Sequence, residues 1–191
     1  MTPIQHTFGG VADCFVLKLQ SDGQKILYST YLGGERADAG RSMAVDSFGQ
    51  AVVTGYTFFR DFPVVNAFQP NYKGNLDAFV AKLAANGQRL IFSSFLGGSD
   101  EENASSISDS TPVGSIAIDR GGNIYVGGKT SSSDFPLVLP TQTELRGETD
   151  GFVCKLDPSG TRLLFSTYIG SSTAENNIGD ERITGLVVDG R

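Results

Sequence analysis

The residues of this chain that could do chemistry are mostly carboxylates, because other reactive types are scarce. His6 is the only histidine and lies in an irregular N-terminal segment, so no Ser-His-Asp triad or His-centred acid/base pair can be assembled. Cys14 and Cys154 match neither a CxxC motif nor a zinc-ligand spacing, and a disulfide between them is not expected. No glycine-rich phosphate-binding motif precedes a helix. The sequence therefore predicts no catalytic residue, no cofactor and no His/Cys metal centre.

The most acidic stretch is SDEENASSISDSTPVG, which follows Gly98. It offers the oxygen ligands that a hard cation such as calcium takes, but its spacing differs from that of an EF-hand loop. A solvated acidic loop is the default interpretation, and a weak calcium site is the alternative. The calcium candidates are Asp100, Glu101, Glu102 and Asp109.

Other aspartates recur in step with a repeat, and each comes directly before or after a turn. An Asp side chain at such a position accepts hydrogen bonds from nearby backbone N–H groups. Turn chemistry is therefore the favoured interpretation, with a cation or catalytic role as the alternative. The recurring residues are Asp13, Asp77 and Asp150, then Asp46 and Asp119, then Asp61 and Asp134.

The elements that must position these side chains belong to an internal repeat. The segments DCFVLKL (13–19), DAFVAKL (77–83) and DGFVCKL (150–156) are spaced 64 and then 73 residues apart. Each is followed by a turn containing glycine and by a second apolar run, such as LIFSSFLGG (90–98). Alternating apolar residues separated by tight glycine turns are typical of paired strands. The sequence therefore predicts one hairpin used three times.

A second pair of segments recurs between these hairpins. SMAVDSFGQAVVTGYT (42–57) and SIAIDRGGNIYVGGKT (115–130) both lead into a DFP loop, at 61–63 and 134–136. A third copy begins with ITGLVVDGR (183–191). The predicted order is a hairpin, then two units of four strands, then one inner strand.

Four strands per 60–70 residues with short connections are the sequence mark of β-propeller blades, because one sheet cannot bury both faces until neighbours stack on it. A β-helix is the main rival, but its rungs are shorter and seldom contain two-residue hairpins. No segment is amphipathic over three helical turns, so we expect almost no helix. The predicted fold class is all-β, with four-stranded antiparallel β-propeller blades in a partial open arc of about three blades.

The combination of DAFVAKL, LIFSSFLGG, SIAIDRGGNIYVGGKT and SSSDFP resembles the bacterial SBBP repeat, a β-propeller repeat of large secreted or cell-surface proteins. The resemblance covers nearly the whole chain, from about Ala12 to Asp189. It implies that the AVD or AID strand is innermost, that the VVTGY or IYVGG strand is second, and that the hairpin is outermost. It also implies an extracellular or cell-surface location, and it brings no common catalytic motif.

This architecture makes the chain a single partial propeller. Residues 1–40 hold the outer hairpin of a first blade, 41–98 a blade, 99–113 an insert loop, 114–170 a blade, and 171–191 an insert loop with the first strand of a further blade. About three blades cannot close a ring, which usually needs about 4–8. The remaining blades belong either to a longer chain, the favoured explanation, or to further copies that close a ring.

Charge and hydropathy limit the classes of partner that the chain can bind. The net charge of −6 and the absence of a basic run argue against nucleic acid, whose binding needs clustered Lys and Arg. No apolar stretch approaches the roughly 18 residues that span a bilayer. The N-terminal residues do not form a signal peptide. We expect a soluble chain without a nucleic-acid partner or a membrane span.

The inserts after Gly98 and Gly170 join the outer strand of one blade to the inner strand of the next, so they should project from the same face. Loops held by rigid sheets often carry binding sites. We therefore expect a non-enzymatic binding or scaffolding platform for a protein or glycan ligand. The alternative is an enzyme propeller, a lyase or hydrolase, with Asp46, Asp119 and Asp189 in its channel; a purely structural spacer is a third hypothesis. The binding-face candidates are Asp100, Glu101, Glu102, Asn103, Glu175, Asn176 and Asp180.

Overall fold

The computed structural model describes residues 3–103, 113–171 and 179–189. These residues form ten strands and no helix, and so none of them belongs to a helix that could cross a membrane. The first two strands, β1 (Cys14–Leu19) and β2 (Ile26–Leu32), pair as an antiparallel hairpin. The prediction of an all-β chain is confirmed.

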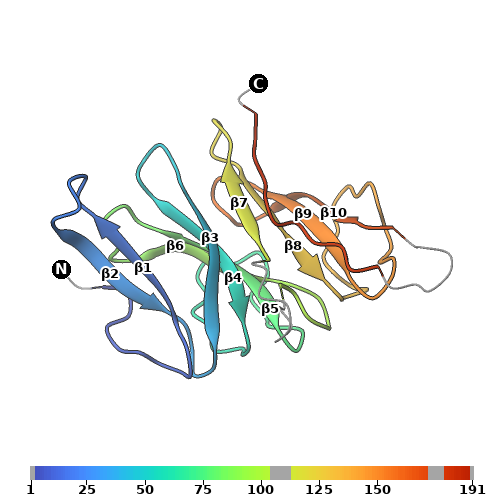
Figure 1. Cartoon of the computed structure of the whole chain (residues 1–191), viewed down its shortest axis with the longest axis horizontal. Coiled ribbons are helices and arrows are strands. Elements are labelled where there is room, and N and C mark those ends of the chain that lie inside the picture. The colour runs from blue at the N-terminus through green and yellow to red at the C-terminus, as the bar shows by residue number, and fades with distance from the viewer. Residues whose placement is uncertain (1–2, 104–112, 172–178, 190–191) are drawn as a thin grey trace.

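Two four-stranded antiparallel sheets follow the hairpin, and in Figure 1 the three units lie side by side in chain order. Their strand orders, β3-β4-β5-β6 and β10-β9-β8-β7, are those of two propeller blades, which we call the first and second blade. The first blade comprises β3 (Asp38–Val45), β4 (Ala51–Thr57), β5 (Asp77–Leu83) and β6 (Leu90–Leu96). The second comprises β7 (Ser115–Ile118), β8 (Ile124–Thr130), β9 (Asp150–Leu156) and β10 (Leu163–Ile169).

The first blade begins slightly earlier than the predicted boundary at residue 41. Strand β3 starts at Asp38, because Asp38 and Ala39 already pair with Thr57 and Tyr56 of β4. The sheet order places the AVD strand at one edge of the sheet and the VVTGY strand next to it, with the hairpin at the other edge.

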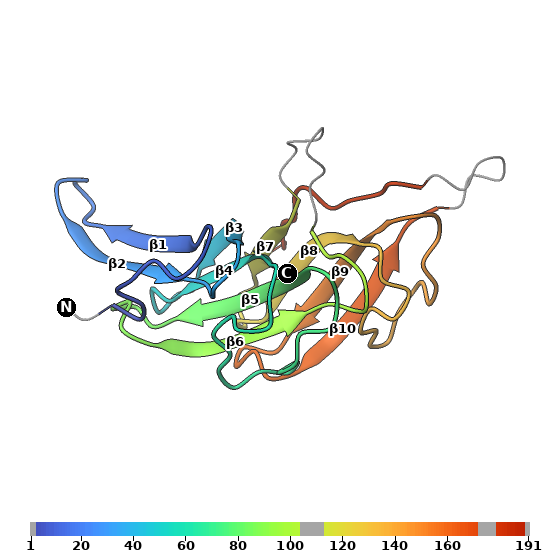
Figure 2. The same ribbon diagram turned by 90° about the horizontal axis from the view of Figure 1, so that it is seen from below.

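The hydrophobic core lies between the sheets and not within any one of them, as expected for stacked blades. One cluster joins the hairpin to the first blade through Val16, Leu32, Phe79 and Phe95, among others. A second cluster joins the two blades. The free thiols of Cys14 and Cys154 lie buried in different clusters. Figure 2 shows the stacking from below.

The second cluster draws one set of side chains from the first blade and another from the second. The first blade contributes Val52, Ala78, Val80, Phe92 and Leu96, and the second contributes Ile116, Ile124, Val126, Phe135, Phe152, Cys154, Leu156 and Tyr168.

The inner strand predicted from Ile183 is absent from the described residues 183–189, which carry no strand assignment. A strand needs a neighbour in its own sheet, whereas this segment lies on the face of the second blade. The Ile183 N–H donates to Gly128 O at 3.1 Å, and a Cβ on Gly127 would lie 2.6 Å from the Ile183 side chain. The segment therefore occupies the place of an inner strand without a ladder partner.

Candidate functional site

The predicted binding-face residues do not share one environment. Asp100, Glu101 and Asp180 are exposed, although the carboxylate of Asp180 forms ion pairs and a hydrogen bond with its neighbours. Glu102 and Asn103 are completely buried. The calcium candidate Asp109 and the face candidates Glu175 and Asn176 lie outside the described residues.

Glu102 is not a surface residue, which corrects its assignment to the binding face. Its carboxylate accepts hydrogen bonds from the Thr130 hydroxyl at 2.7 Å, from the Ser132 hydroxyl and from the Gly98 N–H at 3.2 Å. Burial raises the pKa of Glu102 to about 8, against the lowering effect of these hydrogen bonds. The side chain points into the junction between the blades because its partners lie on the second blade and on the loop that follows β6.

Asn103 likewise faces inward and joins the two blades. Its side-chain amide donates to Gly55 O on β4 at 3.4 Å, and its side-chain oxygen accepts from the Lys129 N–H on β8 at 3.1 Å. Its φ of 57° lies in the left-handed region, which Asn tolerates better than most residues. Glu102 and Asn103 therefore connect the stacked blades, and they do not belong to the predicted binding face.

The backbone of Asp100 and Glu101 is held firmly although both side chains are exposed. Asp100 N–H donates to Ser132 Oγ at 2.9 Å, and Asp100 O accepts from the Asn75 N–H at 3.0 Å. Glu101 exchanges hydrogen bonds with Ser131. The structure thus presents two carboxylates on a rigid connection beside the loop that precedes β5.

The calcium candidates are not assembled into a site within the part of the chain that the structure describes. Glu102 turns inward while Asp100 and Glu101 remain exposed. No group of three or more His, Cys, Asp or Glu side chains among the described residues is arranged to hold a metal ion.

Asp180, the remaining face candidate that the structure describes, is engaged by its neighbours. Its carboxylate forms ion pairs with Lys129 at 3.0 Å and Arg182 at 2.8 Å, and it accepts a hydrogen bond from the Thr149 hydroxyl. These contacts lower its pKa, with the Lys129 hydrogen bond as the largest cause.

Asp77 and Asp150 begin β5 and β9, and Asp13 directly precedes β1, the hairpin strand that corresponds to these third strands of the blades. All three aspartates bond to the loop before them. Asp13 accepts from the Gly9 N–H, and Asp77 accepts from the N–H groups of Lys73 and Gly74. Asp150 accepts from the Arg146 N–H. Their interpretation as turn residues is confirmed by these contacts.

The inner-strand aspartates, considered as channel carboxylates of an enzyme, bond to turns and to lysines. Asp46 accepts from the N–H groups of Phe48 and Gln50 and forms an ion pair with Lys82 at 3.0 Å. Burial raises the pKa of Asp46, but these N–H groups and the Lys82 ammonium outweigh that effect and lower it. Asp119 is held in the same way by Asn123 and lies 3.7 Å from the Lys155 ammonium.

Carboxylates from successive units meet around each Gly-Gly pair that follows an outer strand. A Cβ on Gly33 would lie 2.7 Å from Asp13 Oδ1 and 2.8 Å from Asp38 Oδ2, and one on Gly34 would collide with Asp61. Asp77, Glu102 and Asp134 surround Gly97 and Gly98 in the same manner. We call these two clusters the first and second carboxylate junctions. Glycine is required there because the carboxylates fill the space of a side chain.

A recurring glutamine, which was not predicted from the sequence, binds the first glycine after each outer strand. Gln5, Gln69 and Gln142 each accept a hydrogen bond at the side-chain oxygen from the first glycine after the outer strand, at 2.9, 3.2 and 3.0 Å. Each stands eight residues before Asp13, Asp77 or Asp150. That constant spacing is the signal that would have extended the first repeat to Gln5.

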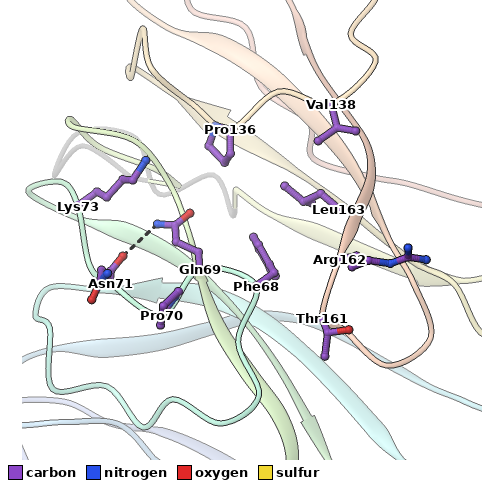
Figure 3. A pocket seen from close by; sticks show the side chains of 10 residues that line it. All are labelled: Phe68, Gln69, Pro70, Asn71, Lys73, Pro136, Val138, Thr161, Arg162 and Leu163. Carbon is purple, nitrogen blue, oxygen red and sulfur yellow. Dashed lines mark hydrogen bonds between the residues drawn. The ribbon is translucent and has the colours of Figure 1, made fainter.

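A groove of about 550 Å³ opens between the two blades beside the second junction, and Figure 3 shows its lining. The loop before β5 forms one wall, and the DFP loop of the second blade together with the start of β10 forms the other. Gln69, whose side chain donates to Asn71 O at 3.3 Å, links the groove to the junction. The lining residues are Phe68, Gln69, Pro70, Asn71, Lys73, Pro136, Val138, Thr161, Arg162 and Leu163.

The comparison with protein families agrees with this geometry. The model described as SBBP, beta-propeller repeat, matches residues 105–136, a stretch that includes β7, β8 and the second DFP loop. No curated protein matches the chain. Together with the strand order of the two blades, the match identifies residues 105–136 as an SBBP β-propeller repeat.

Proposed function

We propose that this chain is a non-enzymatic β-propeller module that acts as a binding or scaffolding platform in a bacterial extracellular or cell-surface protein. The groove between the two blades carries the proposal, because its walls come from loops that only the stacking of blades brings together. The recurring carboxylates support it further, since they bond to turn N–H groups and lysines and pack against the junction glycines. Rigid sheets with a loop-lined groove are a common arrangement for recognition.

The lining indicates the chemistry of the ligand. Phe68, Pro70 and Leu163 supply apolar surface, whereas Lys73 and Arg162 are exposed cations. A local pair of cations in a chain of net charge −6 favours a ligand that carries carboxylates. The ligand we propose is a short extended protein segment in which apolar residues stand next to Asp or Glu.

The acidic side chains of Asp100 and Glu101 extend this surface. Asn75, in the loop that leads from the groove to β5, donates its N–H to Asp100 O. The backbone of Asp100 therefore lies beside the loop that forms one wall of the groove, and we propose that the exposed carboxylates of Asp100 and Glu101 contact a basic group of the same partner. Among the described binding-face candidates, Asp100 and Glu101 are the two acidic residues whose side chains remain free.

A peptide selection tests the proposal. A random 12-residue display library would be selected on the wild-type chain, and the affinity of enriched peptides would be measured by calorimetry. We expect sequences that combine Asp or Glu with aromatic or aliphatic residues. The variant Lys73→Glu/Arg162→Glu should bind them on the order of ten-fold or more weakly, because it repels their carboxylates. Lys25→Glu, an exposed charge reversal on the hairpin turn, is the matched control.

Two results would contradict this function. Equal peptide affinity for the wild type and the double variant would remove the groove as the site. Binding on a glycan array without any peptide binding would assign the platform to carbohydrate. The proposed location is tested separately by surface labelling of intact cells, where a protein accessible only after lysis would refute it.

A further inference from the structure

The outward face of the hairpin exposes apolar side chains that its counterparts in both blades bury. Phe15 is 62% exposed, whereas Phe79 and Phe152, at the same place in β5 and β9, are 0% exposed. Leu17 and Leu19 are also exposed, and their counterparts are fully buried as well. We call the surface formed by Phe15, Leu17, Leu19, Ile26 and Tyr31 the leading face.

The opposite end of the stack exposes the complementary surface. Ile169 on β10 is 46% exposed, whereas its counterparts Leu32 and Leu96 are 0% exposed. Val153 and Phe165 are partly exposed, whereas Val80 and Phe92 are 0% exposed. We call the surface formed by Val153, Lys155, Phe165 and Ile169 the trailing face.

The chain itself shows what covers each face, because leading and trailing surfaces meet twice within it. The hairpin presents Val16 and Tyr28 to the first blade, and the first blade presents Val80 and Phe92 to the second. In the first blade these contacts are made by Phe79, Ala81 and Leu83, at alternate positions of β5. In the second blade they are made by the corresponding residues of β9, Phe152, Cys154 and Leu156. The two free faces are thus the unmatched halves of a third interface of the same kind.

The hairpin glycines give this pairing its register. The ring of Tyr28 lies against Gly87, and the ring of Phe92 lies against Gly160, at distances that leave no room for a Cβ. Gly23 has the same turn position and a similar φ of 73°, yet nothing lies within 4 Å of its Cβ position. Phe165 is the third ring in this series, and Gly23 is the third glycine.

A lysine contact repeats in the same way. Lys18 donates to Ala85 O at 3.3 Å, and Lys82 donates to Pro158 O at 3.5 Å, each from a third strand to the hairpin turn of the next unit. In the sequence alignment of the units, Lys155 on the trailing face corresponds to Lys18 and Lys82. Ser21, in the turn next to the leading face, corresponds to Ala85 and Pro158. Apolar, glycine and lysine positions therefore all select the same alignment.

We propose that the trailing face of one copy of this chain binds the leading face of a second copy, head to tail. Phe165 lies on Gly23 of the second copy, and Lys155 reaches the Ser21 carbonyl. The 183–189 segment of the first copy then covers the inner side of the hairpin, with Val187, 90% exposed in the single chain, facing Met43, which is 54% exposed. Two copies supply four complete blades and two incomplete ones, each made of a hairpin and a 183–189 segment without a second strand. These six units lie within the range of about 4–8 that closes a propeller.

Such a contact joins two different surfaces, and this makes it testable by complementation. Phe15→Glu disables only the leading face, and Ile169→Glu disables only the trailing face. In sedimentation velocity over roughly 1–100 µM, we expect the wild type to self-associate and each variant to weaken association on the order of ten-fold or more, because a charge is buried in an apolar contact. An equimolar mixture should form a complex of two chains through the two intact faces.

The control is Leu139→Glu, which adds the same charge at a site that is 79% exposed. Its counterpart Asn66 stays exposed in a blade with neighbours on both sides, so this position lies outside the interface. Melting temperatures near that of the wild type would show that the variants fold. A wild type that sediments as a monomer at all concentrations, or variants that fail to complement each other, would overturn the proposal.

Discussion

The Thr130 hydroxyl donates a 2.7 Å hydrogen bond to the Glu102 carboxylate at a point where both side chains are fully buried. Glu102 precedes the second blade in sequence, and a Cβ on Gly97 of the first blade would meet both Glu102 and Asp77. The junction between blades thus buries two carboxylates completely, and this burial raises the pKa of each.

Glu102→Gln should alter how stability depends on pH. The pKa of Glu102 is raised to about 8 in the folded chain, against 4.5 as its ordinary value. The unfolded chain therefore releases this proton first, and the free energy of unfolding falls as pH rises between about 4.5 and 8. Gln removes that contribution, and its side-chain oxygen can still accept hydrogen bonds from the Thr130 and Ser132 hydroxyls. The wild type should lose on the order of 1 kcal/mol per pH unit, or less, relative to the variant.

Urea unfolding at several pH values from 5 to 9 measures this difference, with Glu101→Gln as an exposed neighbouring control. A constant difference between wild type and Glu102→Gln over that range would contradict the raised pKa.

Lys82→Met should be far more destabilising than the same change at Lys129. The Lys82–Asp46 pair is 3.0 Å long, with side chains 7% and 5% exposed, so its removal leaves a buried carboxylate without its cation. We expect a loss of about 2–4 kcal/mol, because the turn N–H groups still bond to Asp46. Lys129 pairs with the more exposed Asp180, and its loss should cost about 1 kcal/mol or less. Similar losses for the two variants in chemical unfolding would disprove the assigned role of the Lys82–Asp46 pair.

The strands could be predicted from sequence because their signals are local. Alternating side chains in DAFVAKL and the glycine turns mark β5 and its hairpin, and the repeat then places the remaining strands. The prediction of an inner strand from Ile183 was wrong because a strand needs a neighbouring strand to pair with, and a local sequence pattern does not guarantee that neighbour.

The candidate site could be predicted only in part, because its key contacts are distant in sequence. Glu102 stands in an acidic stretch that is typical of a solvated loop, but Thr130 and Ser132, 28 and 30 residues away, turn it inward. The groove was not predictable from one unit, since Phe68 and Leu163 belong to different blades. Gln69 was missed although its spacing from Asp77 recurs, because a single glutamine in a loop carries no local signal.

Leu139→Asn should stabilise the chain. Leu139 has a φ of 47° and is 79% exposed, so it bears left-handed strain without burying its side chain. Asn66 occupies the same position in the first blade with a φ of 49°, and its amide donates to Ile91 O at 2.9 Å. We expect a gain of about 0.5–1 kcal/mol in the free energy of unfolding. The reverse change, Asn66→Leu, should destabilise; a stabilising effect of that change would refute the argument.

Gly160→Ala should separate packing strain from backbone strain when it is compared with Gly23→Ala. Both glycines have a positive φ, 70° and 73°, so both substitutions carry a similar backbone cost of about 1 kcal/mol. Only at Gly160 would the new methyl group meet the Phe92 ring, since the space at Gly23 is open in the single chain. Overpacking adds about 1–3 kcal/mol. We expect Gly160→Ala to unfold at clearly lower urea than Gly23→Ala in a Phe15→Glu background, which leaves the leading face unoccupied. Equal midpoints would mean that the second blade can move away from Phe92 without loss, and that the ring-on-glycine contact does not set the register between units.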